Sequence, residues 1–166
     1  MAIFTAGQRL RASALEALSV RASPIGAYKQ ADTTRVSNVT ATADPELTVS
    51  VPIGVYICEA VVLYQTPAAA DFKVGWIGGT GANVGQWWSK WRTSDGTEVS
   101  GVLSSDVSLR NVVGASAMPP DQPVNMGGVC VVTQASSLAI RWAQVTSTAG
   151  DTKVLAGSYL RLVKIS

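Results

Sequence analysis

Residues 123–166 decide the fold, and they read PVNMGGVCVVTQASSLAIRWAQVTSTAGDTKVLAGSYLRLVKIS. Apolar residues such as Leu138, Ile140 and Trp142 recur there at every second position, and turn residues interrupt the pattern at short intervals. Alternation with period two between Gly, Ser and Asp clusters is typical of strands joined by tight turns. We therefore expect this part of the chain to form antiparallel strands.

The last of these strands is apolar on both faces. Leu160 and Leu162 point to one side of it, and Tyr159, Val163 and Ile165 point to the other. A strand in an antiparallel sheet usually keeps one face in water. The second apolar face therefore needs its own cover, and a neighbouring subunit is the simplest candidate.

The preceding residues contain further strand patterns separated by turn signals. We expect strands at residues 35–42, 47–51, 55–64, 72–76, 99–103 and 107–113. Gly79, Gly81 and Gly85 lie in a Gly- and Trp-rich segment, residues 78–98, which we expect to be an inter-strand loop. With the closing strands, the total is nine or ten strands without an intervening helix, which predicts an all-β sandwich or barrel.

The composition excludes several classes of function. The sequence has no histidine, which removes Ser-His-Asp and Cys-His catalysis and every metal site that contains histidine. The net charge of +2 is too small and too dispersed for a nucleic-acid footprint. No apolar window reaches the ~18 residues of a transmembrane helix. We therefore expect no enzymatic activity, cofactor, nucleic acid or membrane.

Charged residues make up only 14% of the chain, against ~25% in typical soluble domains. Much of the surface is therefore expected to be covered by partners. Residues 1–35 carry a net charge of +3, which predicts an acidic partner surface for this end of the chain.

Residues 1–23 are the only plausible helix. Thr5 and Gln8 have the spacing of a capping box, and Leu10, Leu15 and Leu18 fall on one face. A short isolated helix is marginal in water and needs a surface on which to dock. We predict an N-terminal anchoring arm and linker at residues 1–43 and a β-domain at residues 44–166.

Four of the five tryptophans lie within residues 76–91. Exposed rings of Trp87, Trp88 and Trp91 would stack on sugars and form a glycan contact. The competing interpretation, which the sequence favours, is that they pack in the core or between subunits.

Three buried-strand residues remain to be explained. Cys58 and Cys130 lie in predicted strands and are either free buried thiols or a single disulfide. Glu59 interrupts an apolar strand, and we predict an ion pair with Arg141 or Arg161.

Both ends of the chain resemble structural proteins of tailed bacteriophages. The opening FTAGQRLRASALEAL resembles the start "F-x-x-G-Q-x-L-T-A-x-x-L-N-A" of such proteins, especially those from actinobacterial hosts, with Arg11 in place of the usual Thr and no Asn at Ala17-Leu18. The ending resembles the closing strands of small phage fibre and head-decoration domains, which read "L-x-L-x-W-A-Q-x-x-S … V-x-x-G-S-x-L-x-L-x-R-I". The matching positions are Phe4, Gly7, Gln8, Leu10, Ala12 and Leu15, and Leu138, Ile140, Trp142, Ala143, Gln144, Val154, Gly157, Ser158, Leu160, Leu162 and Ile165.

The β-domain is also similar in outline to the trimeric C1q/TNF-like jelly rolls. These resemblances imply an antiparallel jelly-roll sandwich in a non-enzymatic virion protein that is assembled in the host cytoplasm. A homotrimer would form through Tyr159, Leu160, Leu162 and Val163, with strands 157–165 and 55–64 near the threefold axis. Phe4, Leu10, Leu15 and Leu18 would anchor it to the major capsid protein or another virion protein. A capsid decoration or head-fibre protein and a tail-fibre receptor-binding module for host cell-surface glycan remain the two alternatives.

Overall fold

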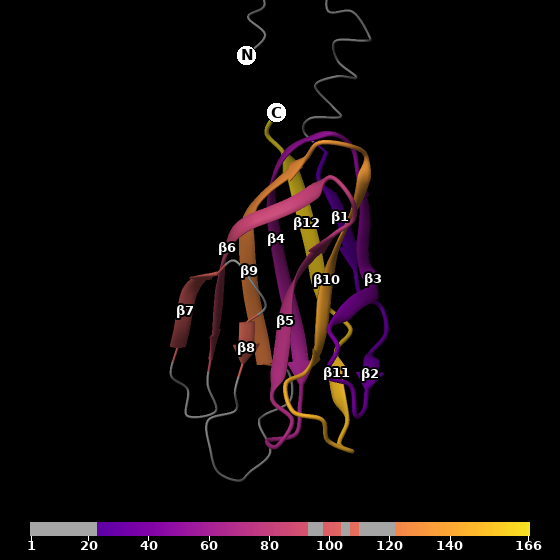
Figure 1. Cartoon of the computed structure of the whole chain (residues 1–166), viewed down its shortest axis with the longest axis vertical. Helices are drawn as coiled ribbons and strands as arrows, with labels where there is room; N and C mark the ends of the chain where they lie inside the picture. The colour runs from indigo at the N-terminus through magenta and orange to yellow at the C-terminus, as the bar shows by residue number, and fades with distance from the viewer. Residues whose placement is uncertain (1–22, 93–97, 104–106, 110–121) are drawn as a thin grey trace, which may run out of the picture.

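The computed structural model describes residues 23–92, 98–103, 107–109 and 122–166, and these residues form twelve β-strands and no helix (Figure 1). The strands are β1 Ile25–Tyr28, β2 Thr33–Arg35, β3 Thr42–Val51, β4 Gly54–Gln65, β5 Phe72–Gly78, β6 Ala82–Arg92, β7 Glu98–Leu103, β8 Val107–Leu109, β9 Gln122–Val132, β10 Ser136–Gln144, β11 Thr152–Val154 and β12 Tyr159–Lys164. The helix expected at residues 1–23 falls, except for Ser23, outside the described residues.

The strands pair from the two ends of the chain inward. The antiparallel pairs are β1 with β12, β2 with β11, β3 with β10, β4 with β9, β5 with β8 and β6 with β7. The described chain is therefore one long hairpin. The pairs β3·β10 and β5·β8 lie in one sheet and the others lie in the second sheet, so the hairpin is wrapped around a core. This is a jelly roll, and it confirms the predicted all-β antiparallel sandwich.

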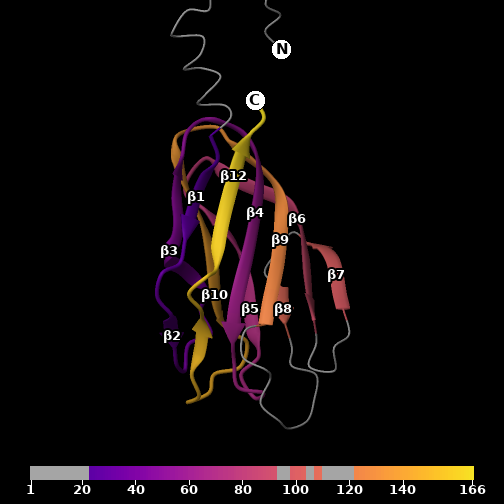
Figure 2. The ribbon, with the colours of Figure 1, turned by 180° about the vertical axis from the view of Figure 1, so that it is seen from behind.

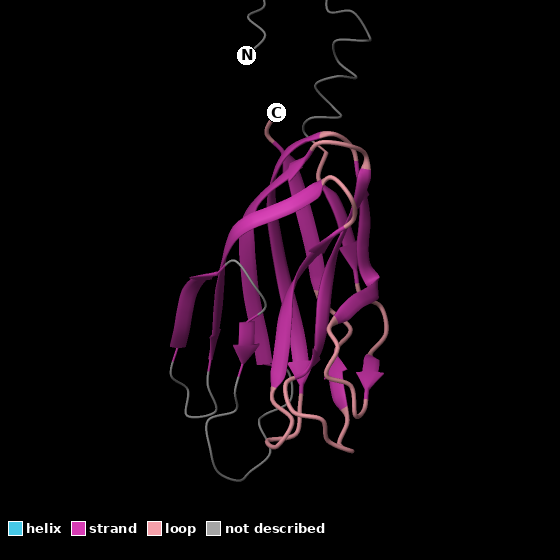
Figure 3. Ribbon diagram, viewed as in Figure 1, coloured by secondary structure: helices cyan, strands magenta, loops and turns pink. Residues whose placement is uncertain are grey.

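The two sheets form two layers (Figures 2 and 3). The larger sheet has the order β1-β12-β4-β9-β6-β7, with β11 joining β2 to β4, and the smaller sheet has the order β3-β10-β5-β8. Ile25 is paired with Leu162, so the start of β1 and the end of β12 lie at the same end of the sandwich. Any segment preceding β1 therefore leaves from the end that also carries the C-terminus.

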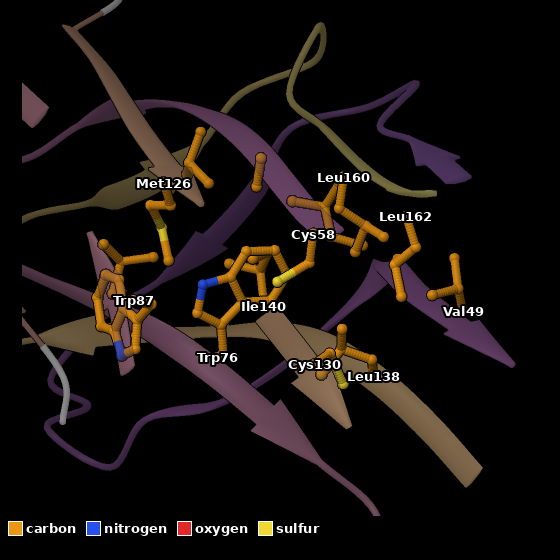
Figure 4. Close-up of a cluster of buried hydrophobic side chains, with 14 of the residues drawn as sticks. Val49, Cys58, Trp76, Trp87, Met126, Cys130, Leu138, Ile140, Leu160 and Leu162 are labelled. Atoms are coloured by element: carbon orange, nitrogen blue, oxygen red, sulfur yellow. The ribbon is translucent and has the colours of Figure 1, made fainter. Parts of the chain in front are cut away.

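The core lies between the layers and follows the period-two pattern of the strands (Figure 4). Leu138, Ile140 and Trp142 are fully buried in register on β10, as the alternation predicts. The larger sheet contributes Cys58, Ala60, Val62, Met126, Cys130, Leu160 and Leu162 to the same cluster. Each large apolar side chain buried in this way contributes ~1.5–3 kcal/mol to the free energy of unfolding.

The strand β6 corrects the prediction of a loop at residues 78–98. The loop is only a tight turn, in which the N–H of Ala82 donates to the carbonyl of Gly79 at 3.0 Å. Gly81 has a φ of +84°, a conformation in which a Cβ would be strained. Because these glycines reverse the chain within four residues, a full strand follows at Ala82.

The first two strands correct the predicted domain boundary at residue 43 and the predicted strand 35–42. Ile25 and Ala27 of β1 pack against the core, and β2 pairs with β11. The sandwich therefore begins within the segment expected to be a linker. Its sequence resembles a linker because many of its residues are polar. Some of these polar side chains are nevertheless buried, including Lys29, whose side chain is fully inaccessible.

Candidate interaction surface

The outward side of the larger sheet, over β1, β12, β4, β9 and β6, carries most of the exposed apolar side chains; we call it the outer face. Six of the ten large hydrophobic side chains that are exposed among the described residues lie there: Tyr28, Ile57, Trp88, Val129, Val131 and Tyr159. They alternate along their strands with core residues, so they point away from the core.

The strand register joins these side chains into rows. Val163, Ile57 and Val129 lie side by side across β12, β4 and β9. Tyr28 and Tyr159 lie side by side on β1 and β12 in a second row. Directly opposite neighbours in a sheet are in side-chain contact range. The outer face therefore carries two apolar rows, and exposed apolar groups gathered on one face mark interaction sites.

One ion pair lies between the two apolar rows. Arg161 Nε is 4.0 Å from Glu59 Oε2, and both side chains are more than half exposed. This confirms the predicted pairing of Glu59 with Arg161; Arg141, the other candidate, belongs to β10 of the smaller sheet. An exposed pair of this kind contributes little to stability, with a median of ~0–1 kcal/mol, and both charges remain available to a partner.

Of the four residues predicted at the trimer interface, two lie in the core and two lie on the outer face. Leu160 and Leu162 are 1% and 0% exposed, and they lie in the core of the single chain. Their assignment to an interface is therefore corrected, because the smaller sheet already covers them. Tyr159 is 39% exposed and Val163 is half-buried, and both lie on the outer face.

The predicted glycan platform of three tryptophans is not assembled. Trp87 is 3% exposed and lies in the core beside Met126 (Figure 4), and Trp91 packs partly buried against the same core. Only Trp88 is exposed, at 45%, and its indole covers Gly127, where an added Cβ would lie 2.5 Å from the ring. The alternation along β6 places Trp88 on the opposite face from Trp87 and Trp91, because a strand sends successive residues to opposite faces.

Cys58 and Cys130 are free and buried, which answers the question that the sequence left open. They lie on neighbouring strands but not opposite each other, since Cys58 pairs with Gly128 and Cys130 with Tyr56. Burial raises the pKa of Cys58 to about 12 and also raises the pKa of Cys130. A thiol that stays protonated is unreactive, so both act as small apolar core residues.

A buried polar cluster, which the sequence analysis missed, lies where β1 leads into β2. Lys29 Nζ donates to Asp44 Oδ1 at 3.0 Å, to Glu46 Oε2 at 3.0 Å and to Thr33 Oγ1 at 2.6 Å. The side chains of Lys29 and Asp44 are both 0% exposed. We call Lys29, Asp44 and Glu46 the buried triad. Its only signal in the sequence is the interruption of β3 by two carboxylates.

The buried triad is joined to the core through tryptophan. Trp142 Nε1 donates to Asp44 Oδ2 at 3.0 Å. The guanidinium of Arg35 lies over the Trp142 ring at 4.0 Å, within the range of a cation–π interaction, and its Nη1 donates to the Trp142 carbonyl. Burial lowers the pKa of Arg35. These contacts fasten β2 and β3 to β10 of the smaller sheet.

The remaining expectations concern the anchoring residues, a metal site and a membrane-spanning helix. Phe4, Leu10, Leu15 and Leu18, the predicted anchoring residues, lie outside the described residues. Within the described ranges, no three His, Cys, Asp or Glu side chains are grouped so as to hold a metal ion. In the same part of the chain, no helix is long and apolar enough to cross a membrane.

Comparison with known proteins gives structural similarity only. No family model and no curated protein matches the sequence. Among solved structures, Eiger TNF from S. frugiperda is 17% identical with a TM-score of 0.43, and the match covers 86% of this chain and 92% of that one. VP2 of the infectious bursal disease virus subviral particle is 11% identical with a TM-score of 0.44, and the match covers 86% of this chain and 32% of that one. A further structure, of the Gx strain of that virus, is 11% identical with a TM-score of 0.25, and the match covers 86% and 41% of the two chains. At these identities the likeness concerns the fold alone.

Proposed function

We propose that this protein is a non-enzymatic structural component of a bacteriophage particle, and that it assembles as a homotrimer through the outer face. The observation that carries the proposal is the gathering of five exposed apolar side chains on one face of the larger sheet, namely Tyr28, Ile57, Val129, Val131 and Tyr159. The two resemblances in the sequence supply the phage context.

In the proposed trimer, the outer face of each chain contacts the two other copies of the same chain. Each copy carries both a cation and an anion there, Arg161 and Glu59, at the centre of the apolar surface. In a closed symmetric assembly, the cation of one subunit meets the anion of the next, so the charges need no other partner. Burial of the surrounding apolar side chains supplies the association energy.

Attachment to the particle is assigned to the segment that precedes β1. The start of β1 lies at one end of the sandwich, so the arm at residues 1–23 leaves from that end and the outer face stays free for trimerisation. The basic charge of the N-terminal residues favours an acidic surface on the major capsid protein or another virion protein. We favour decoration of the capsid over a place on the tail; the closing strands resemble small phage fibre and head-decoration domains, and the opening motif resembles structural proteins of tailed phages in general. The same arm on a tail fibre is the alternative.

The receptor-binding alternative, in which the protein recognises a host glycan, is weaker. A sugar platform needs several accessible rings, and Trp88 is the exposed tryptophan of the three that were expected.

Deletion of residues 1–23 tests the arm, and sedimentation tests the trimer. The truncated protein is expected to sediment as a trimer with an unchanged β-rich circular dichroism spectrum, and to lose binding to particles stripped of the native protein. Full-length protein prepared in parallel is the control for particle quality. Truncated protein that still decorates particles with unchanged affinity would refute the anchoring role, and a folded monomer at micromolar concentration would refute the trimer.

A further inference from the structure

The buried triad brings together an amine and a carboxyl group that are both closed to solvent and a partly exposed proton acceptor. Lys29 Nζ lies 3.0 Å from Asp44 Oδ1 and 3.0 Å from Glu46 Oε2. We propose that Lys29 and Asp44 condense, without any added reagent, to form an amide bond between their side chains. The bond would be a covalent modification built by the fold itself.

Burial favours the neutral product over the ion pair. The side chains of Lys29 and Asp44 are both 0% exposed, and Trp142 and Leu47 beside them are also fully buried. Removing two charges from water carries a large desolvation cost that their mutual attraction only partly offsets. An amide has no net charge, so condensation removes this cost.

The backbone holds the reacting groups in place before any chemistry occurs. The N–H of Lys29 donates to the carbonyl of Ser158 at 2.8 Å, and Thr48 Oγ1 donates to the carbonyl of Asp44 at 2.8 Å. Groups held in near-contact react as if at very high local concentration, which removes much of the entropic part of the barrier.

The carboxyl group of Asp44 is polarised by three N–H donors. Its Oδ1 accepts from the backbone N–H of Glu46 at 3.0 Å and of Leu47 at 3.2 Å. Its Oδ2 accepts from Trp142 Nε1 at 3.0 Å. Fixed donors of this kind stabilise the negative charge that develops on oxygen when an amine attacks a carbonyl carbon.

Glu46 is placed to carry the protons. Its side chain is 34% exposed, so it connects the buried amine to solvent. The hydrogen bond from Lys29 lowers the pKa of Glu46 and keeps it as a carboxylate, the form that accepts a proton.

The atoms and charges of the step balance. Glu46 accepts a proton from the Lys29 ammonium and passes it to Oδ2 of Asp44, and the freed electron pair of Nζ then attacks Cγ of the neutral carboxyl group. Oδ1 takes the negative charge, held by the two backbone N–H groups. A second proton then passes from Nζ to Oδ2. The Cγ–Oδ2 bond breaks, water leaves, and the amide keeps Oδ1 as its carbonyl oxygen.

The proposed bond has a defined place in the fold. Lys29 directly follows β1 of the larger sheet, and Asp44 lies in β3 of the smaller sheet. The amide would join the two layers at the end of β1 that lies away from the N-terminal arm. A pull on the arm could then peel β1 away from β12 only as far as Lys29, where the covalent link would stop it.

The test is the mass of the full-length protein measured under denaturing conditions. We expect a mass lower than the sequence mass by one water molecule. A cyclic imide at Asp95-Gly96 would cause the same loss, so tryptic mapping decides the site. Trypsin does not cleave after an acylated lysine, and we expect a branched product in which a peptide of residues 22–35 is joined to one of residues 36–73. A linear peptide that ends at an unmodified Lys29, recovered from folded wild-type protein, would overturn the proposal.

Two variants test the roles within the buried triad. K29R keeps a cation beside Asp44 but is not expected to condense, so it should show the full sequence mass. E46Q keeps an acceptor oxygen for the N–H of Gln30 but accepts no proton, so newly folded E46Q should form the bond at least tenfold more slowly than wild type. Equal rates would exclude Glu46 as the proton carrier. The wild-type mass and peptide map stand by themselves if either variant fails to fold.

Discussion

Replacement of Ile57 by alanine isolates the contribution of the outer face. Ile57 lies between Val163 and Val129 in the central apolar row, and 44% of its surface is exposed in the single chain. Full burial of an isoleucine side chain stabilises by ~1.5–3 kcal/mol, so the part still exposed is worth about 1 kcal/mol if a subunit covers it. A trimer contains three such sites and should lose about 3 kcal/mol in I57A.

That loss predicts a specific shift in assembly. Each 1.4 kcal/mol corresponds to a factor of ten, so the association constant of the trimer should fall by about a hundredfold. Sedimentation equilibrium over a concentration series measures this shift. V39A is the matched control, because Val39 is 42% exposed but lies in the loop between β2 and β3. Equal association of I57A and wild type, or an equal loss in V39A, would refute the assignment of the outer face.

Three further predictions concern the core. W142A should lower the free energy of unfolding by ~3–5 kcal/mol in urea titrations, because it leaves a cavity and removes the donor to buried Asp44; stability equal to wild type would contradict the packing described. L162D should fail to fold rather than form a soluble monomer, because Leu162 is fully buried within one chain; a folded monomer in size-exclusion chromatography would contradict this. Cys58 should resist alkylation by iodoacetamide at pH 8 until urea unfolds the protein, since burial raises its pKa to about 12. The unfolded thiol ionises near its ordinary pKa of ~8.5, so the stability that Cys58 contributes should decline as pH rises from there towards the folded value.

The alternation of apolar residues predicts the core of this protein well. Leu138, Ile140 and Trp142 lie in register in the core, and the opposite orientations of Leu162 and Val163 are observed. Because a strand has a strict period of two, the pattern specifies which residues share a face. It does not specify which of the two faces lies against the second sheet, and for this reason Leu160 and Leu162 were assigned to a subunit interface.

Polar burial and long-range pairing could not be predicted in the same way. Nothing adjacent in the sequence shows that Lys29 meets Asp44, because the pairing depends on how β1 and β3 come together. The alternation of Trp87, Trp88 and Trp91 along β6 was hidden by the neighbouring glycines, which indicated a loop. The turn at Gly79–Gly81 is shorter than the long loop that a Gly-rich segment usually indicates.

The inward pairing of strands from the two chain ends determines when this protein folds. On the ribosome, β1 emerges first, but its partner β12 is synthesised after all the other strands. The sandwich therefore closes only once β12 has emerged, and pairings between strands so distant in sequence fold in milliseconds to seconds rather than microseconds. During that interval the N-terminal arm is already present, whereas the outer face, through which we propose that subunits associate, is not yet complete. The proposed subunit assembly would accordingly follow the synthesis of β12, and a chain terminated within β12 leaves β1 and much of one edge of β4 unpaired and prone to aggregation.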